Sequence, residues 1–250
     1  MSRKVWGLIP ARLDSSRLFQ KVLKELHGLP MVVHVAKRSQ LADNIDEVIV
    51  CTDSTKIIQT CFKYDIKVCI TPDSCKNGTE RILAAKKRLD IPNRDLVIDI
   101  QGDDPLVTPK TLNQVADYIK KTTNEDVIAI PHIELCPASN KNVVKVVASG
   151  NKVIYLTRSD APYPFNNYIQ LKKHLSVIGF SGESLEMFGR LSVGELEAIE
   201  GVELLRAVEG GMNVETFLID SENSFSVDVI DDFQRAERSL RTCPIFASGY

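Results

Sequence analysis

Several features that would place this chain in a familiar class are missing from its 250 residues. Acidic and basic residues nearly balance, at a formal charge of −2, so the composition offers no general electrostatic attraction for nucleic acid. No apolar run approaches membrane-spanning length, and the N-terminus lacks the apolar core and small-residue cleavage site of a signal peptide. We therefore expect a cytoplasmic protein with no nucleic-acid partner and no membrane insertion.

Cysteine patterns that would indicate a metal site or a disulfide framework are also absent. The six cysteines show neither a Cys-x-x-Cys pair nor zinc-ligand spacing. Cys51 and Cys69 lie inside apolar runs, where reduced cysteine behaves as a small hydrophobic residue. This usage indicates a reducing compartment.

The common glycine-rich phosphate motifs do not occur either. There is no Gly-x-x-x-x-Gly-Lys-Ser/Thr sequence, and no Gly-x-Gly-x-x-Gly follows the first apolar run. This argues against a P-loop ATPase and against an ordinary dinucleotide-dependent oxidoreductase. Any phosphate grip must come from side chains and from the backbone amides of the turn at 13–16.

The first half of the chain alternates short β-rich runs with stretches of helical periodicity. Strands are predicted at 5–9, 47–52, 67–71, 96–100 and 127–130, and helices at 31–41, 55–64, 79–89 and 109–121. This order is typical of an α/β fold with a Rossmann-like, mostly parallel sheet flanked by helices. Further strands are predicted at 143–147, 152–155, 175–180, 213–219 and 225–229, and helices at 194–209 and 231–241. We expect one domain, 1–250, with a β-rich insertion at about 143–180 that could cover a cleft or form a dimer contact.

The most informative segment follows the first predicted strand. It gathers three cations and two hydroxyls in a short loop, namely Arg12, Ser15, Ser16, Arg17 and Lys21. A hydrophobic core has no use for three cations at one strand end, whereas a polyphosphate requires them. Taken alone, however, this segment is better explained as a solvated basic loop.

A second charged turn, of opposite sign, ends the predicted strand at 96–100. In Gln101-Gly102-Asp103-Asp104-Pro105 the glycine permits a tight turn and the proline prevents continuation of the strand. Adjacent carboxylates suit Mg²⁺, which completes its shell with phosphate oxygens, although Asp-rich turns also form for local reasons. Ligands of open parallel sheets bind beyond the carboxyl ends of the strands. Together the two turns predict a nucleoside triphosphate with its metal.

Three other features are less specific. A glycine turn at 77–81 leads into a predicted helix and carries Arg81, which could equally be a solvated cation. Asp228 lies in an apolar run, so it must face solvent or meet a cation, because a buried unpaired carboxylate is costly. His174 by itself is typical of an ordinary surface histidine.

Read in order, the motifs of this chain resemble those of the 3-deoxy-D-manno-octulosonate (Kdo) cytidylyltransferases, or CMP-Kdo synthetases. The resemblance runs nearly end to end through Pro10-Ala11-Arg12, Ser15-Ser16-Arg17, Lys21, Cys51-Thr52-Asp53, Gly78-Thr79-Glu80-Arg81, Gln101-Gly102-Asp103-Asp104-Pro105, Asn142-Val143-Val144-Lys145, Tyr155-Leu156-Thr157-Arg158, His174-Leu175 and Val227-Asp228. It implies a nucleotidyltransferase, GT-A-like fold and a homodimer. The implied reaction joins CTP to a 3-deoxy-octulosonic acid and releases pyrophosphate, with Mg²⁺ as cofactor, for lipopolysaccharide or capsule synthesis.

The resemblance also implies residue roles. CTP would be bound by Pro10, Ala11, Arg12, Ser15, Arg17, Lys21 and Gln101. Asp103 and Asp228 would hold magnesium and would form the catalytic set with Lys21. The sugar acid would meet Arg81, Gln101, Arg158, His174, Glu200 and Glu203.

This chain departs from the family pattern at three places. Phe19-Gln20 stands where Pro-Gly is usual, which puts the backbone path beside the phosphates in question. Ile178 replaces an expected aromatic residue and Leu204 replaces a glutamine, so the sugar pocket becomes more apolar. We expect a retained nucleotide half and a sugar half adapted to a Kdo variant, such as an 8-amino form.

Two alternatives remain open from the sequence. One is a synthetase for a nine-carbon acid of the sialic or legionaminic type, which the Gly-Thr-Glu-Arg and Gln-Gly-Asp-Asp-Pro segments disfavour. The other is a nucleotide-binding relative without catalysis. The presence of both Asp103 and Asp228 argues against that second alternative, because mere binding needs no second carboxylate.

Overall fold

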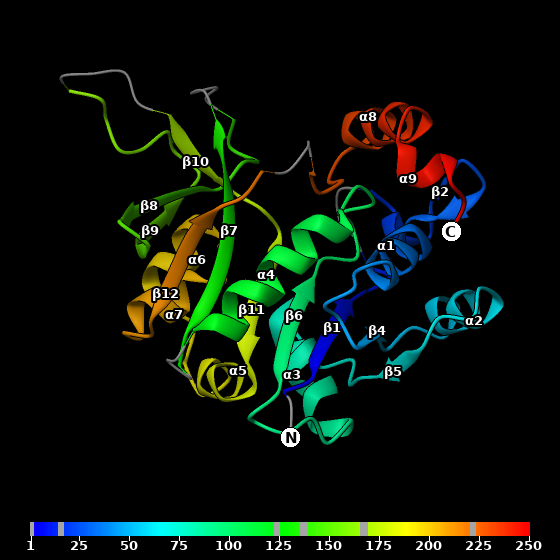
Figure 1. Cartoon of the computed structure of the whole chain (residues 1–250), viewed down its shortest axis with the longest axis horizontal. Coiled ribbons are helices and arrows are strands. Elements are labelled where there is room, and N and C mark those ends of the chain that lie inside the picture. The colour runs from blue at the N-terminus through cyan, green and yellow to red at the C-terminus, as the bar shows by residue number, and fades with distance from the viewer. Residues whose placement is uncertain (1–2, 15–17, 123–125, 136–139, 166–169, 221–223) are drawn as a thin grey trace.

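The computed structural model describes residues 3–14, 18–122, 126–135, 140–165, 170–220 and 224–250. Within these ranges the strands are β1 (Val5–Pro10), β2 (Glu25–Leu26), β3 (Leu29–Pro30), β4 (Glu47–Thr52), β5 (Val68–Ile70), β6 (Leu96–Ile100), β7 (Ile128–Leu135), β8 (Lys145–Ser149), β9 (Lys152–Thr157), β10 (Leu171–His174), β11 (Val177–Ser181) and β12 (Val214–Leu218). The helices are η1 (Lys21–Leu23), α1 (Met31–Gln40), α2 (Thr55–Lys63), α3 (Gly78–Arg88), α4 (Pro109–Lys121), α5 (Gly182–Phe188), α6 (Glu195–Glu200), α7 (Leu205–Glu209), α8 (Ile230–Arg241) and α9 (Pro244–Ala247). The expected α/β sheet flanked by helices is confirmed (Figure 1).

One ten-stranded mixed sheet carries the fold, in the order β10-β8-β9-β12-β7-β11-β6-β1-β4-β5. Its first-half strands β6, β1, β4 and β5 are parallel to one another. Alternate residues of these strands enter two separate cores, since Val5 and Ile9 pack with α1 and α4 whereas Leu8 packs with α3. The parallel half therefore has both faces buried, and its carboxyl ends form a common edge.

The other half is largely antiparallel. β10 pairs with both β8 and β7, so that β7, β12, β9, β8 and β10 close on themselves as a ring of strands. β11, which falls within the predicted insertion at 143–180, lies between β6 and β7. The strands of that segment thus belong to the same sheet as the parallel half.

Three predicted elements are wrong in detail. The predicted strand at 225–229 has no strand pairing, because Val227 N donates to the carbonyl of the Asp103 turn (2.8 Å). The predicted helix at 194–209 is two helices, α6 and α7, because Gly201 adopts a left-handed conformation (φ 61°) that ends α6. The predicted strand at 175–180 begins only at Val177, after a tight turn in which Val177 N bonds to Leu175 O (2.7 Å).

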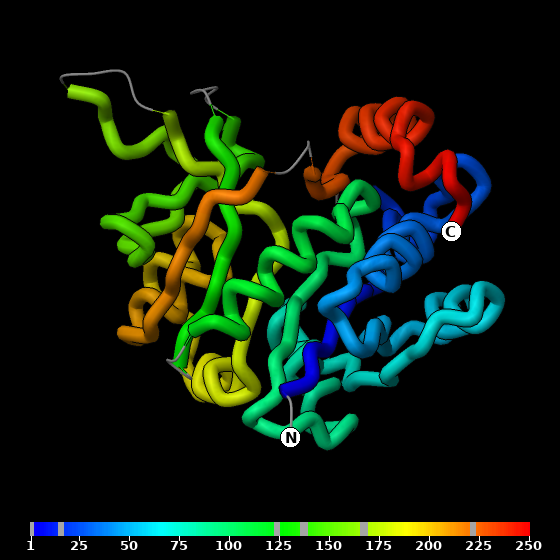
Figure 2. Tube along the Cα trace, in the orientation of Figure 1, coloured from blue at the N-terminus to red at the C-terminus, as the bar shows by residue number. Residues whose placement is uncertain are grey.

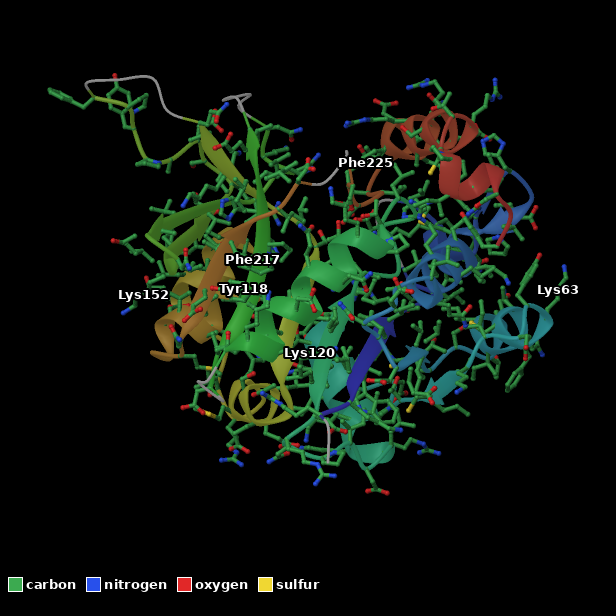
Figure 3. The ribbon with its side chains drawn as sticks, viewed as in Figure 1. Lys63, Tyr118, Lys120, Lys152, Phe217 and Phe225 are labelled. Carbon is green, nitrogen blue, oxygen red and sulfur yellow. The ribbon has the colours of Figure 1, made fainter. Side chains whose placement is uncertain are left out.

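One contact joins the two halves of the sheet region, and a second joins the C-terminal helices to β2. Tyr118 of α4 stacks on Phe217 of β12 with ring centroids 4.1 Å apart, and Figure 3 shows the two side chains next to each other. α8 packs through Ala236 and Leu240 in one apolar cluster with Leu26 of β2, and Figure 2 shows the red C-terminal tube beside the blue segment that carries β2. None of the helices in the described ranges has the length and hydropathy needed to cross a bilayer.

Candidate active site

A pocket of about 280 Å³ lies at the carboxyl ends of β1 and β6. From the predicted site residues it brings together Pro10, Ala11, Arg12, Lys21, Arg81, Gln101, Asp103, Glu203 and Asp228. The turn of β6 reaches the loop of β1 because Gly102 lacks a side chain: a Cβ there would lie 2.9 Å from the carbonyl oxygen of Pro10. The two charged turns predicted from the sequence are therefore adjacent.

Lys21 lies between the two predicted metal carboxylates. Its Nζ is 2.5 Å from Asp103 Oδ2 and 3.1 Å from Asp228 Oδ1, and it also donates to Val227 O (3.1 Å). Burial alone would lower the pKa of Lys21, but the two carboxylates outweigh it and raise the pKa. The ammonium therefore stays charged, and both carboxylates are aimed at one cationic position.

The adjacent aspartates of the β6 turn have different surroundings. Asp103 lines the pocket, whereas Asp104 is buried and accepts hydrogen bonds from the Ser224 hydroxyl and from Leu106 N (3.2 Å). Burial raises the pKa of Asp104, although the Ser224 hydrogen bond opposes the rise. Asp104 thus ties the turn to the segment before Asp228 and leaves Asp103 to face the pocket.

The unusual Phe19-Gln20 dipeptide forms the turn that delivers Lys21. Gln20 takes a left-handed conformation (φ 49°, ψ 39°) directly before η1, and Phe19 is 77% exposed. A residue with a Cβ is strained in that region, where glycine is not. The tight turn expected of a Pro-Gly pair is therefore kept, with Gln20 in the position suited to glycine.

Arg81 is a further cationic side chain that lines the pocket. Asn77 caps α3 by accepting from Glu80 N (2.8 Å), which starts the helix so that Arg81 turns inward. The Arg81 side chain is 4% exposed, and its guanidinium pairs with Asp53 Oδ1 (2.8 Å) and donates to Thr71 Oγ1 (2.7 Å). These two partners hold Arg81 in a fixed orientation at the pocket.

Two further acidic side chains are associated with the pocket: Glu203 lines it, and Asp99 lies behind Gln101. Glu203, in the connection between α6 and α7, accepts from the Thr79 hydroxyl (2.7 Å), and burial raises its pKa. Asp99 of β6 is fully buried and accepts from Gln101 Nε2 through both oxygens (3.1 Å each). Asp99 was not among the predicted site residues, although a carboxylate inside the apolar strand Leu96–Ile100 was a visible signal.

A second pocket, of about 230 Å³, adjoins the first, and Asp228 lines both. It contains Arg158 and His174, which the first pocket does not. The Arg158 guanidinium donates hydrogen bonds to the backbone carbonyl oxygens of Glu200 (2.8 Å), Lys141 (2.9 Å) and Gly201 (3.2 Å). Burial, reinforced by Lys173, lowers the pKa of His174 to about 4, so this imidazole is neutral at physiological pH.

The remaining predicted site residues are at the edge of the pockets, away from them, or outside the described residues. Glu200 lines neither pocket and accepts from Thr157 Oγ1 (2.6 Å) and Arg158 N (2.9 Å) at the end of β9. Arg12 is exposed at the mouth of the first pocket. Ser15 and Arg17 lie outside the described residues. In the described part of the chain, no group of three or more His, Cys, Asp or Glu side chains forms a metal site.

Cations and carboxylates gathered at the carboxyl ends of parallel strands define an α/β nucleotidyltransferase-like protein. The cytidylyltransferase family model matches residues 6–215. The chain is 32% identical to a 3-deoxy-manno-octulosonate cytidylyltransferase of a Nitratiruptor species, over 93% of this chain and 98% of the relative. It is 33% identical to an 8-amino-3,8-dideoxy-manno-octulosonate cytidylyltransferase of a Shewanella species, over 93% and 97%. The chain belongs to the 3-deoxy-manno-octulosonate cytidylyltransferase family.

A solved structure agrees with this membership. CMP:2-keto-3-deoxy-manno-octonic acid synthetase, determined in complex with CTP, superposes with a TM-score of 0.87 at 25% identity, over 95% of this chain and 98% of that one. The fold expected from the resemblance is thereby confirmed over almost the whole chain.

Proposed function

We propose that this protein activates a 3-deoxy-octulosonic acid with CTP, giving the CMP-sugar and pyrophosphate. The observation that carries the proposal is the convergence of Asp103 and Asp228 on the Lys21 ammonium, at the floor of a pocket that also holds Arg12 and Arg81. That arrangement suits a substrate with a triphosphate at one end and a carboxylate at the other. Family membership supplies the identity of the nucleotide and of the sugar class.

The nucleotide would lie along the loop after β1. Pro10 and Ala11 would form the side of the pocket along which the nucleotide lies. The cations Arg12 and Lys21 would neutralise phosphate charge, and Ser15 and Arg17 are further proposed contacts. Ala11 N donates to Cys51 O (2.9 Å), which holds the start of this loop against β4. A fixed loop start lets the cations act without reorganising during the reaction.

Magnesium is the proposed cofactor, bound by Asp103 and Asp228. The fit rests on the two carboxylates already meeting one cation, Lys21 Nζ, and on their hard oxygen donors. Two protein carboxylates leave the rest of an octahedral shell to phosphate oxygens and water. When bound, the metal would supply charge neutralisation at the α-phosphate and would lower the pKa of the attacking hydroxyl.

The sugar acid would lie where the two pockets meet at Asp228. Its carboxylate suits Arg81, and its hydroxyls suit Gln101, Glu203 and the neutral imidazole of His174. In the reaction the anomeric oxygen bonds to the α-phosphorus, the bond to the bridging oxygen of pyrophosphate breaks, and the hydroxyl proton passes to solvent. The side chains contribute mainly positioning and charge neutralisation, which phosphoryl-type transfer requires most.

Pyrophosphate release is the direct test. The wild-type protein is mixed with CTP and Kdo, with and without Mg²⁺, and parallel reactions omit the sugar or replace it with a nine-carbon acid. We expect release only with CTP, an octulosonic acid and Mg²⁺. Release with the nine-carbon acid alone would support the sialic-type alternative, and no release with any acid would leave a nucleotide-binding protein.

We further propose a cytoplasmic homodimer whose product feeds lipopolysaccharide or capsule synthesis. The described part of the loop between β9 and β10 carries Tyr163 and Phe165, which are 82% and 86% exposed, and Ile154 of β9 is 54% exposed. Large exposed apolar side chains mark surfaces that associate. Sedimentation analysis tests the dimer, and a Tyr163→Ser, Phe165→Ser variant should shift the equilibrium to monomer.

A further inference from the structure

Lys21 uses its whole hydrogen-bonding capacity on one small group of acceptors. Its ammonium donates to Asp103 Oδ2 (2.5 Å), to Asp228 Oδ1 (3.1 Å) and to the backbone carbonyl oxygen of Val227 (3.1 Å). A lysine ammonium has three N–H donors and no acceptor, so these three contacts occupy all of them. In this arrangement Lys21 has no donor left for a phosphate oxygen.

The backbone that carries Lys21 is held on both sides. Lys21 N donates to Leu18 O (3.2 Å), and Lys24 N donates to Lys21 O (3.1 Å), which closes the turn and η1. Val22, the next residue, is buried in the core. The lysine stem is flexible, so the ammonium can exchange partners by rotation of the side chain while the loop stays in place.

The two carboxylates cannot serve the Lys21 ammonium and a divalent cation at once. One ammonium and two carboxylates leave one negative charge among these three side chains, whereas a divalent cation would neutralise both carboxylates. A cation bound to the same oxygens would lie beside the ammonium, and like charges repel strongly at a site that is only 14–21% exposed. Metal and ammonium therefore compete for one position.

We propose that Lys21 occupies the cation position between Asp103 and Asp228 until nucleotide arrives, and so makes metal binding depend on CTP. The inference rests on the proposed function and adds a binding order to it. A triphosphate offers the ammonium new acceptors in the same pocket, which Arg12 and Arg81 also line. Lys21 then turns to the phosphates, and the freed carboxylates can hold Mg²⁺. By linkage, nucleotide binding gains from the metal by the same factor.

The test measures binding of Mn²⁺ alone to nucleotide-free protein, from the electron paramagnetic resonance signal of free Mn²⁺. Mn²⁺ takes the same oxygen ligands as Mg²⁺. Lys76→Met is the matched control for Lys21→Met, because Lys76 also lines the pocket but in the described part of the chain forms no ion pair with Asp103 or Asp228. We expect Lys21→Met to bind Mn²⁺ at least about tenfold more tightly than the wild type, and Lys76→Met to stay within about threefold.

Three further variants locate the effect. Lys21→Arg keeps the positive charge and should bind Mn²⁺ as weakly as the wild type. Lys21→Gln keeps an amide donor for the carboxylates, so it preserves local hydrogen bonding if Lys21→Met does not fold, and it should show the same gain as Lys21→Met. Adding Asp103→Asn to either neutral variant should remove the gain, because it removes one of the two carboxylates.

Unchanged or weaker Mn²⁺ binding in the neutral Lys21 variants would overturn the inference. So would an equal gain in Lys76→Met, or a gain that survives Asp103→Asn, because either result would indicate a general charge effect. Pyrophosphate release by the wild type is measured separately. Its absence would overturn the proposed function, whereas release together with unchanged Mn²⁺ binding in Lys21→Gln would overturn the binding order alone.

Discussion

The backbone amide of Val227 donates a 2.8 Å hydrogen bond to the carbonyl oxygen of Asp103. This bond joins the C-terminal segment to the turn after β6, and it places the next residue, Asp228, beside Asp103. Lys21 then bridges the two carboxylates. The geometry of the proposed metal site therefore depends on a main-chain contact as well as on the acidic side chains.

Removing that amide should disturb the site more than the fold. We expect Val227→Pro to lose about 1 kcal/mol from the missing hydrogen bond, and more if Val227 cannot adopt the proline φ. Pyrophosphate release should fall at least tenfold. Val227→Ala is the control, since it keeps the N–H but removes buried volume at a cost of about 1–3 kcal/mol. Greater loss of activity in Val227→Ala than in Val227→Pro would contradict a positioning role for the amide.

Neutralising either Asp103 or Asp228 should greatly lower the catalytic rate without unfolding the protein. We expect Asp103→Asn and Asp228→Asn to lower kcat by at least about a hundredfold, because each removes a charge aimed at the site of phosphate chemistry. Circular dichroism should remain that of the wild type. Isothermal titration with Mg²⁺ and CTP measures the metal contribution, and retained magnesium-dependent turnover would remove both residues from the metal assignment.

The left-handed turn at Gln20 leads to a stability prediction. Gln20→Gly removes a Cβ from a position with φ 49°, and it should raise the free energy of unfolding by about 0.5–1 kcal/mol, after allowance for the greater freedom of unfolded glycine. Gln20→Ala keeps the Cβ and should give no such gain. Urea denaturation of the two variants compares them directly, and equal stabilities would show that the turn is not strained.

Acid should destabilise the protein through His132. Burial, with a smaller effect of Lys172, lowers the pKa of this imidazole to about 4, and its Nδ1 bonds to Thr216 Oγ1 (2.7 Å). Because the unfolded state takes up the proton near pH 6.5 and the folded state only near 4, stability is full above 6.5 and falls as the pH drops toward 4. The contribution is about 3 kcal/mol, from 1.36 kcal/mol per pKa unit.

Urea denaturation between pH 4.5 and 7.5 measures this loss, and His132→Asn should flatten part of the slope. The pKa of His174 is also lowered to about 4, so His174 should account for a similar part of the decrease in stability as the pH falls. An unchanged slope in the variant would show that His132 does not titrate in this range.

The strands and helices of the parallel half could be predicted from the sequence because their signals lie within each segment itself. The apolar runs of β1, β4 and β6 and the helical periodicity of α3 act through neighbouring residues, so their bounds are accurate within one or two positions. Residues 225–229 have the composition of a strand, yet their hydrogen bonds go to the Asp103 turn, a partner more than a hundred residues away. No local pattern encodes such a choice.

The same limit applies to the site. The charged turns around Lys21 and Asp103 could be read as ligand-binding because each follows an apolar strand. The separation of Arg158 and His174 into a second pocket, and the use of Glu200 at the end of β9, depend on how the ring of strands closes. The contact of Asp99 with Gln101 Nε2 is likewise a side-chain contact that the apolar pattern of the strand does not encode.

Lys21 and Asp228 are 207 positions apart, and their contact has a consequence for biosynthesis. At roughly 5–20 residues per second, a ribosome takes about 10–40 s to add the segment that separates them. Once Asp103 has been added, the emerging chain contains the basic loop and the first carboxylate, but it lacks the second carboxylate until Asp228 is added. On the proposed assignment of Asp228 as a metal ligand, a nascent chain can transfer nucleotide only after Asp228, which lies just before α8, has been added, so the order of synthesis delays the proposed chemistry until most of the chain is made.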